Sequence, residues 1–215
     1  MTGKIKILIA DDHAIVRKGL KQIVSEQPDM MVAGEASDAA ELLSLLGKEE
    51  CSVVVLDINM PGKSGLEALR EIKSNYPNLP VLILSIYSED LYGIRAIKAG
   101  ADGYLKKVSA PDELVSAIRR IVGGGKYISQ QLSEKLASSL KRDAVIYPHE
   151  KLSDREYQIL CHIALGKTAE QIAGILSISV NTFYSYRNRI LEKTGLKSNV
   201  ELARYAIRNK LVEPE

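Results

Sequence analysis

Short apolar runs alternate with longer amphipathic segments through the first 122 residues of the chain. Five runs rich in Val, Ile and Leu are predicted to be β-strands: Lys6–Ala10, Met31–Glu35, Val53–Asp57, Val81–Ser85 and Gly103–Lys106. Three of them show no polar alternation, which is typical of parallel strands buried on both faces. We therefore expect a central parallel sheet in this part of the chain.

The segments between and after these runs have the apolar spacing of helices. The predicted helices are Ala14–Glu26, Ala39–Lys48, Gly65–Ser74, Glu89–Ala99 and Pro111–Val122. In the third of them, Leu66, Leu69 and Ile72 form one apolar stripe on an otherwise polar helix. Five strand–helix units of this length predict an α/β domain with a five-stranded, parallel, doubly wound sheet of the flavodoxin-like kind.

The pattern changes after residue 122. Three consecutive glycines, Gly123 to Gly125, interrupt it, and Gln130–Lys141 is predicted to be a short helix within a linker. From Leu152 onward no strand pattern recurs, and short helices are expected at about 154–165, 168–176, 179–194 and 198–209. Ser153 and Glu156 have the spacing of a capping box at the start of the first of these.

These patterns divide the chain into three parts. We expect an α/β domain over residues 1–122, a linker with a short helix over 123–149, and a small all-α domain over 150–215. A chain of 215 residues, with 46% hydrophobic and 26% charged residues, is long enough for two small globular domains.

Composition narrows the class of protein further. No apolar run approaches the ~20 residues that a transmembrane helix needs. The apolar stretch near the N-terminus has neither the length nor the cleavage site of a signal peptide. Cys51 and Cys161 lie far apart without metal-ligand spacing, so we expect reduced thiols. The sequence predicts a cytoplasmic protein that does not associate with membranes.

The net charge of +2 is too small to indicate a nucleic-acid-binding protein by itself. Its distribution adds some information, because residues 1–122 carry a net charge of −2 and residues 150–215 carry +2. A polyanionic partner is therefore expected to bind the C-terminal half.

Polar side chains follow four of the predicted strands where each strand ends. They are Asp11 and Asp12 after the first strand, Asp57 at the end of the third, Ser85 at the end of the fourth, and Lys107 after the fifth. Because the carboxyl ends of parallel strands meet at one edge of a sheet, where ligands bind, we expect these groups to converge.

Three clustered carboxylates repel one another unless a cation neutralises them. Their oxygen ligands suit Mg²⁺. With Mg²⁺ bound, one aspartate could attack phosphorus in line while a lysine stabilises the developing charge. Taken singly, each position has an ordinary explanation, such as an aspartate that caps the next helix or a solvated lysine. The whole set, in this order along the chain, favours a binding site.

Four motifs carry a resemblance to a known family: ADDH (10–13), LDINMPGKSG (56–65), LS (84–85) and GYLKK (103–107). With this order and spacing, residues 5–122 resemble the receiver domain of two-component response regulators. The resemblance implies that Asp57 accepts the phosphoryl group and that Ser85 and Lys107 contact it. It also implies that Tyr104 repositions with Ser85.

The same resemblance implies the metal ligands. They are Asp11, Asp12, Asp57 and the main-chain carbonyl of Asn59, which together hold Mg²⁺. Lys107, rather than Lys106, matches the family lysine because it lies three residues after Tyr104. Many receivers carry proline after this lysine; here Val108 stands in its place, so the family's loop shape is not carried over.

The C-terminal domain has helix-turn-helix character at 168–173 and 179–193. On a helical projection of the second segment, four polar residues share the face opposite Phe183, Ile190 and Thr194, and three cations flank them. The four are Asn181, Tyr184, Ser185 and Asn188, and the cations are Arg187, Arg189 and Lys193. Such a helix suits a DNA major groove, although solvated helices often carry similar polar faces.

Residues 152–207 are similar to the LuxR-type helix-turn-helix of NarL/FixJ regulators. The resemblance implies a helix that contacts DNA through Asn181, Thr182, Tyr184, Ser185, Arg187, Asn188, Arg189 and Lys193. It also implies dimers formed through the last helix, here Val200–Ala206. Phe183, Tyr184 and Tyr186 stand where many members have a small apolar residue, a lysine and a histidine. The sequence preference of relatives is therefore not carried over.

The sequence predicts a response regulator in which a sensor histidine kinase phosphorylates Asp57. Phosphorylation is expected to produce a homodimer that binds double-stranded DNA at paired half-sites and regulates transcription. Such a protein is not an enzyme beyond receiver self-phosphorylation and slow dephosphorylation.

Two alternatives come from other functional classes. One is a Mg²⁺-dependent phosphohydrolase; such enzymes commonly carry a second aspartate two residues after the nucleophile, where this chain has Asn59. The other is a protein-interaction regulator that no longer binds DNA, which the absence of lysine at Tyr184 leaves open. Turnover of phosphate esters would support the first, and a lack of salt-dependent duplex binding would support the second.

Overall fold

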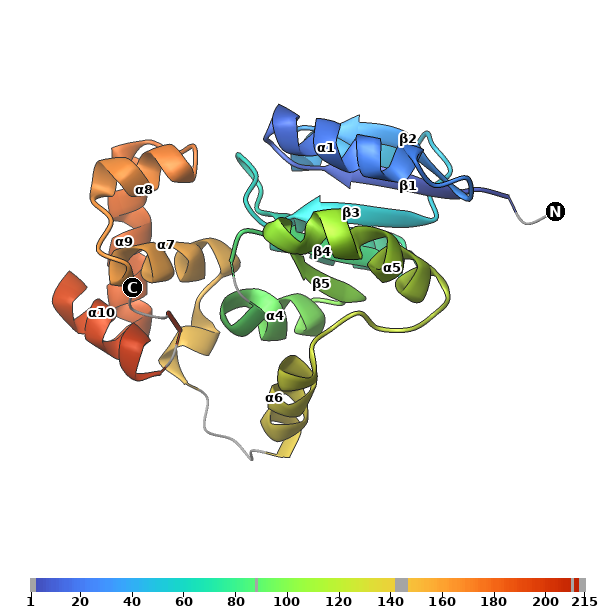
Figure 1. Ribbon diagram of the computed structural model, residues 1–215. Helices are drawn as coiled ribbons and strands as arrows, with labels where there is room; N and C mark the ends of the chain where they lie inside the picture. Colours follow the sequence, from blue (N-terminus) through green and yellow to red (C-terminus); the bar gives the residue numbers. More distant parts are fainter. Residues whose placement is uncertain (1–2, 88, 142–146, 210, 213–215) are drawn as a thin grey trace. The chain divides into compact units, whose positions relative to one another are not determined.

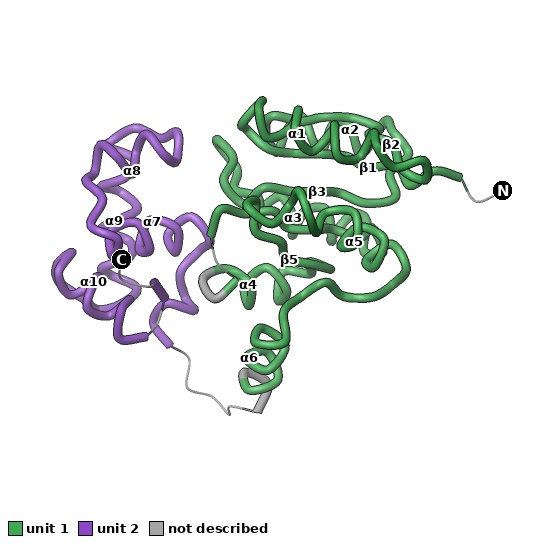
Figure 2. The backbone as a smooth tube through the Cα atoms, in the orientation of Figure 1, with its two compact units in different colours: residues 1–138 green, residues 139–215 purple. Residues whose placement is uncertain are grey.

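The chain forms two compact units, residues 1–138 and 139–215 (Figure 2). The computed structural model describes residues 3–87, 89–141, 147–209 and 211–212. Among these residues, no helix combines the length and the apolar content needed to cross a membrane.

The first unit is built on a five-stranded parallel sheet with the order β2-β1-β3-β4-β5 (Figure 1). The strands are β1 (Ile5–Ala10), β2 (Met30–Ala36), β3 (Val53–Asp57), β4 (Val81–Ser85) and β5 (Gly103–Lys106). The last three match the predicted bounds, and the first two are slightly longer. The predicted doubly wound sheet is confirmed. The strand order reverses between β1 and β3, and ligands bind to such sheets at this switch point.

Five helices cover the sheet on both faces. They are α1 (Ala14–Ser25), α2 (Ala39–Leu46), α3 (Gly65–Asn75), α4 (Glu89–Lys98) and α5 (Ala110–Val122). Crossovers between parallel strands are right-handed. Helix α1, which connects β1 to the edge strand β2, therefore lies on one face of the sheet. Helices α2, α3 and α4, which connect successive strands in the direction of β5, lie on the opposite face. The last helix, α5, returns to the face of α1 (Figure 1).

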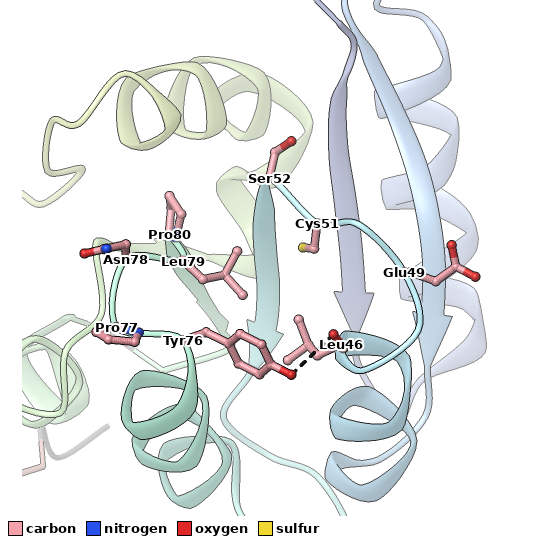
Figure 3. Close-up of a pocket in the computed structure, with 9 residues that line it drawn as sticks. All are labelled: Leu46, Glu49, Cys51, Ser52, Tyr76, Pro77, Asn78, Leu79 and Pro80. Carbon is pink, nitrogen blue, oxygen red and sulfur yellow. Dashed lines mark hydrogen bonds between the residues drawn. The ribbon is translucent and has the colours of Figure 1, made fainter.

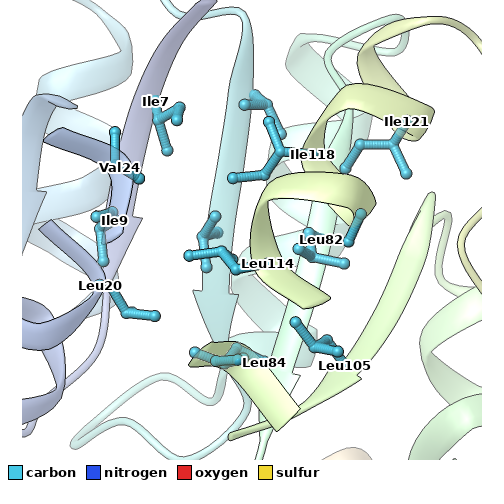
Figure 4. Close-up of a cluster of buried hydrophobic side chains, with 14 of the residues drawn as sticks. Ile7, Ile9, Leu20, Val24, Leu82, Leu84, Leu105, Leu114, Ile118 and Ile121 are labelled. Carbon is cyan, nitrogen blue, oxygen red and sulfur yellow. The ribbon is translucent and has the colours of Figure 1, made fainter. Parts of the chain in front are cut away.

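The core on the α1 and α5 face shows why these segments fold as they do (Figure 4). Alternate strand residues, such as Ile7 and Ile9, point to this face, and Leu20 of α1 and Leu114 of α5 pack against them. Each of these side chains is almost completely buried. Burial of one such side chain contributes about 1.5–3 kcal/mol to folding. The result is a rigid sheet from whose edge the polar residues project.

The second unit is all-helical, as predicted. After a 3₁₀ turn at Pro148–Lys151 it contains α7 (Asp154–Ala164), α8 (Ala169–Ile175), α9 (Val180–Thr194) and α10 (Asn199–Arg208). The predicted capping box at Ser153 and Glu156 is present, with each side chain accepting a hydrogen bond from the other residue's backbone N–H. The predicted linker helix is also observed, as α6 (Gln130–Lys141).

Candidate functional site

The loop after β1 places two aspartates at the carboxyl edge of the sheet. Asp11 is buried and Asp12 is half-buried. Asp11 Oδ1 accepts a hydrogen bond from the backbone N–H of His13 at 2.8 Å, and Arg17 donates to the carbonyl of Asp11 at 2.6 Å. These bonds fold the loop back on itself and hold the Asp11 carboxylate in place before any ligand binds.

Asp57 ends β3 and is almost completely buried. Its Oδ1 accepts a hydrogen bond from the Asn59 backbone N–H at 3.2 Å. The start of α3 lies directly behind it, since a Cβ at Gly65 would be 1.9 Å from the Asp57 carbonyl oxygen. Only glycine fits there, which explains the glycine that ends the LDINMPGKSG motif.

Lys107 forms ion pairs with two of these aspartates, Asp11 and Asp57. Its Nζ lies 2.7 Å from Asp57 Oδ2 and 2.7 Å from Asp11 Oδ2, and its side chain is only 12% exposed. The neighbouring Lys106 is exposed instead. Burial alone would lower the pKa of Lys107, but the charges of Asp57 and Asp11 outweigh it and raise the pKa. Lys107 is therefore a permanent cation between two carboxylates.

The electrostatics of Asp57 are unusual. Its pKa is raised to about 7: burial raises it most, the charge of Lys107 opposes the shift, and the charge of Asp11 adds to it. The ammonium group thus compensates only part of the cost of two buried carboxylates. A second cation at this edge would favour the ionised form of Asp57.

The geometry fits a divalent cation. Asp11, Asp12, His13 and Asp57 can each offer one ligand atom, and these atoms all lie within 4.8 Å of one another. Carboxylate oxygens are the ligands that hard divalent cations prefer. The sequence prediction did not include His13 in this group, although it is part of the ADDH motif. Its Nδ1 lies 2.5 Å from Asp12 Oδ1, so it orients that carboxylate.

Ser85 and Tyr104 are joined through one residue of the loop after β4. The buried Ser85 accepts a hydrogen bond at Oγ from the Tyr87 N–H at 3.1 Å. The buried Tyr104 donates its hydroxyl to the Tyr87 carbonyl, also at 3.1 Å. Burial raises the pKa of Tyr104, so it stays a neutral donor. Ser85 and Tyr104 therefore share Tyr87 as a hydrogen-bond partner.

Three exposed apolar side chains surround this edge. They are Ile15 at the start of α1, Ile86 after β4 and Val108 after Lys107, with exposed fractions of 77%, 64% and 81%. Lys107, Val108 and Ser109 form one 3₁₀ turn, which is the shape the loop takes without the family proline. Exposed apolar residues that gather around a polar site are typical of protein-docking surfaces.

A pocket of about 540 Å³ lies at the opposite edge of the sheet (Figure 3). It is formed where β3 and β4 begin, between Cys51, Ser52, Tyr76 and Pro80. Burial raises the pKa of the Cys51 thiol, so that thiol stays protonated. The amino ends of the strands carry none of the predicted site residues, and the pocket is separate from the carboxylate cluster.

In the second unit, α8 and α9 form the helix-turn-helix. Phe183 and Ile190 are buried, and Arg155 of α7 fixes the turn by donating to the Leu176 carbonyl at 2.5 Å. The four residues predicted to share the outward face are all exposed: Asn181, Tyr184, Ser185 and Asn188. Thr182 is half-buried, and its hydroxyl lies 2.8 Å from the hydroxyl of the capping residue Ser179.

The three flanking cations differ in what they contact. Lys193 Nζ pairs with both carboxylate oxygens of Glu156, at 2.7 and 3.0 Å, so it joins α9 to α7. Arg187 donates to Asn199 at 2.6 Å. Arg189 lies over the ring of Tyr186, 5.8 Å from its centroid, and is exposed. Sequence reasoning could not distinguish these roles, because all three positions flank the same helix face.

Comparisons with known proteins agree with both units. Residues 7–119 match the response regulator receiver domain, and residues 150–206 match the LuxR family of bacterial regulatory proteins. The chain is 36% identical to the response regulator GacA of Pseudomonas aeruginosa, over 97% of this chain and 98% of that protein. It is 35% identical to the response regulator UvrY of Escherichia coli, over 98% and 97%.

Solved structures give the same result. The RcsB response regulator of Salmonella typhimurium is 26% identical, with a TM-score of 0.58 over 96% of this chain and all of that one. An RcsB–DNA complex is 26% identical, with a TM-score of 0.59 over 98% of this chain and all of that one. These relatives are DNA-binding regulators rather than conventional enzymes. The chain therefore belongs to the two-component response regulators, with a receiver domain and a LuxR-type DNA-binding domain, and it regulates transcription under the control of phosphorylation.

Proposed function

We propose that Asp57 accepts a phosphoryl group from the phosphohistidine of a sensor histidine kinase. The observation that carries this assignment is the contact of Lys107 with both Asp57 and Asp11, which puts a cation where charge develops on the transferred group. A carboxylate oxygen of Asp57 forms the new O–P bond as the N–P bond of the kinase breaks.

The metal-binding part of the site is formed by Asp11, Asp12, Asp57 and the main-chain carbonyl of Asn59. We assign Mg²⁺ to it because the donors are oxygens. When bound, Mg²⁺ neutralises phosphoryl oxygens and keeps Asp57 ionised. Lys107 holds the attacking carboxylate in place and then pairs with the phosphoryl group. Ser85 turns its hydroxyl from Tyr87 towards that group, and Tyr104 follows.

Turnover at this site is slow. The residue two positions after Asp57 is Asn59, which has no titratable group to activate water, and its N–H is bonded to Asp57. The receiver therefore catalyses its own phosphorylation and a slow dephosphorylation. It does not act as a phosphohydrolase on other substrates.

The kinase docks on the apolar rim formed by Ile15, Ile86 and Val108. This surface surrounds Asp57, and its large exposed fractions suit a partner with an apolar face. A small phosphodonor needs no such surface. Substitution of Val108 by glutamate should therefore slow transfer from the kinase and leave transfer from acetyl phosphate unchanged.

The output is binding of double-stranded DNA by a homodimer. The outward residues of α9 contact base edges, while Arg187 and Arg189 contact phosphates. Val200 and Ile207 of α10 are exposed and seven residues apart, so they lie on one helix face and suit a dimer contact. We assign residues 1–122 to the receiver, 123–149 to the linker and 150–215 to the DNA-binding domain. A regulator of chromosomal genes acts in the cytoplasm.

One experiment tests the phosphoacceptor. The full-length chain and its Asp57→Asn variant are incubated with acetyl phosphate and Mg²⁺, and intact mass is measured. We expect one phosphoryl group on the unmodified chain and none on the variant. Asp112→Asn, an exposed aspartate on α5, is the matched control and should be phosphorylated normally. Phosphorylation of the Asp57→Asn variant would disprove the assignment.

A further inference from the structure

The chain does not leave the receiver when α5 ends. Gly124, with φ of +85°, turns it back along the sheet, and Tyr127 then lies beside β5 in a parallel bridge with Gly103. The Tyr127 N–H donates to the Asp102 carbonyl at 3.0 Å, and the Tyr104 N–H donates to the Tyr127 carbonyl at 2.9 Å. We call Lys126–Leu132 the strap.

Side chains fix the strap at four points along its length. Lys126 pairs with Asp102 at 2.8 Å, and the Tyr127 hydroxyl donates to Glu113 of α5 at 2.5 Å. The Ser129 N–H donates to Glu89, the first residue of α4, at 2.9 Å. Leu132, in the first turn of α6, is 1% exposed. The strap therefore contacts β5, α5 and α4.

Two glycines make room for this contact. A Cβ at Gly93 of α4 would lie 2.8 Å from Leu132, and a Cβ at Gly103 of β5 would lie 3.0 Å from the Tyr127 Cβ. Any larger residue would push the strap away. Beside the strap lies a cavity of about 450 Å³ lined by Tyr104, Tyr127, Glu89 and Glu113 among others. Tyr104 and the strap therefore line one cavity.

We propose that the strap holds α6 against α4 in the unphosphorylated receiver and is released when Asp57 is phosphorylated. The strap is bonded to the two elements that the phosphorylation site can move. One is Tyr104, through its backbone N–H. The other is the start of α4, through Glu89. The inference rests on the proposed phosphorylation of Asp57.

The direction of the change follows from the hydrogen bonds. Ser85 Oγ accepts from the Tyr87 N–H, and this bond holds the loop that leads to α4. If the Ser85 side chain rotates towards the phosphoryl group on Asp57, its hydrogen bond with the Tyr87 N–H breaks. The Tyr87 carbonyl then no longer fixes the Tyr104 hydroxyl. Glu89, at the start of α4, then shifts and loses its hydrogen bond with the Ser129 N–H, so the strap is released where it meets α4.

Amide hydrogen exchange of the full chain tests the proposal. Exchange of segments within 126–138 is measured by mass spectrometry before and after phosphorylation with acetyl phosphate and Mg²⁺, while intact mass reports the phosphorylated fraction. We expect exchange in 126–138 to rise about tenfold on phosphorylation, and exchange in β1 and β3 to stay unchanged. Leu132→Ala should give about the same rise without phosphorylation. Gln131→Ala, on the exposed side of α6, should not.

The outcomes separate the two proposals. If Asp57 is not phosphorylated, the proposed function fails and the strap mechanism fails with it. If Asp57 is fully phosphorylated but exchange in 126–138 is unchanged or slower, the strap mechanism is wrong and the proposed function stands. A Leu132→Ala protein that exchanges as slowly as the unmodified chain would also overturn it.

Discussion

Two adjacent lysines in the receiver illustrate how far a single residue's position decides its role. Lys106 and Lys107 have the same charge, but only Lys107 reaches Asp11 and Asp57. The GYLKK motif alone does not distinguish them; the match to Tyr104 three residues earlier does. The distinction arises because β5 ends at Lys106 and the 3₁₀ turn begins at Lys107.

We expect Lys107→Met to destabilise the metal-free receiver by about 1–3 kcal/mol, because it leaves two buried carboxylates without their cation. Added Mg²⁺ should then stabilise the variant more than the unmodified chain, since it replaces the lost charge. The chain has no tryptophan, so thermal unfolding is followed by far-UV circular dichroism with and without Mg²⁺. Lys106→Met is the control and should behave as the unmodified chain. Equal stability of the two variants would contradict the role given to Lys107.

His162 of α7 gives the second unit a dependence on pH. Its pKa is lowered to about 4, chiefly by burial and also by the nearby positive charges of Lys167 and Arg155. In the unfolded chain the pKa is about 6.5. The unfolded state thus binds the proton more tightly, and stability is complete above pH 6.5 and declines as the pH falls towards 4. The full effect is about 3 kcal/mol.

His162→Gln should remove this dependence. Urea unfolding at pH 7.5 and pH 5 is expected to show a smaller loss of stability for the variant than for the unmodified chain. His149, a half-buried histidine that contacts Tyr205, is a suitable comparison as His149→Gln. An identical pH dependence in the His162 variant and the unmodified chain would mean that burial of His162 does not set the acid sensitivity.

At the scale of elements, α9 combines a buried face with a polar one, and its exposed cations differ in what they contact. Arg189 is exposed, whereas Lys193 is bound to the buried carboxylate of Glu156. Arg189→Met should therefore weaken DNA binding and reduce the slope of log K against log salt by about 0.9, the value for one phosphate contact. Fluorescence anisotropy of a labelled duplex over a range of salt concentrations measures this slope.

Lys193→Met should have the opposite profile. It should lower the stability of the second unit by about 1–2 kcal/mol, because the buried Glu156 carboxylate loses its cation, and change the salt slope little. If instead Lys193→Met reduced the slope as much as Arg189→Met, the sequence-based assignment of Lys193 to DNA would be right and the ion pair incidental.

Features set by local composition could be predicted from the sequence, and features set by contacts between distant residues could not. Strand and helix bounds agreed closely because burial on both faces gives runs such as Val53–Asp57 an unmistakable composition. The carboxylate site was predictable because parallel strands bring Asp11 and Asp57 to one edge. The path of Lys126–Ile128 along β5 was not, since it depends on glycines at 93 and 103 that leave no local pattern. The pairing of Lys193 with Glu156 spans 37 residues and also has no local pattern.

At the scale of the whole molecule, the question is how a chain with a net charge of only +2 binds DNA specifically. The C-terminal half carries only a small positive charge, so one recognition helix gives limited affinity. Two helices joined in a dimer bind paired half-sites with an effective concentration that multiplies their affinities. Phosphorylation of the receiver can therefore act on DNA binding through dimer formation alone, without any change in α9.

If dimer formation carries the response, the effect of phosphorylation depends on the number of half-sites in the duplex. Phosphorylation should raise affinity for a duplex with two half-sites by about 10²-fold or more, and should change affinity for a duplex with one half-site little. Val200→Glu, which puts a charge on the exposed apolar face of α10, should abolish the gain on the paired site while single-site binding persists; the exposed Glu192→Gln of α9 is the control outside that face. Anisotropy titrations with both duplexes provide the measurement. An equal gain on the single half-site would mean that phosphorylation acts on α9 directly, because a dimer contact cannot improve binding where only one recognition helix has a site.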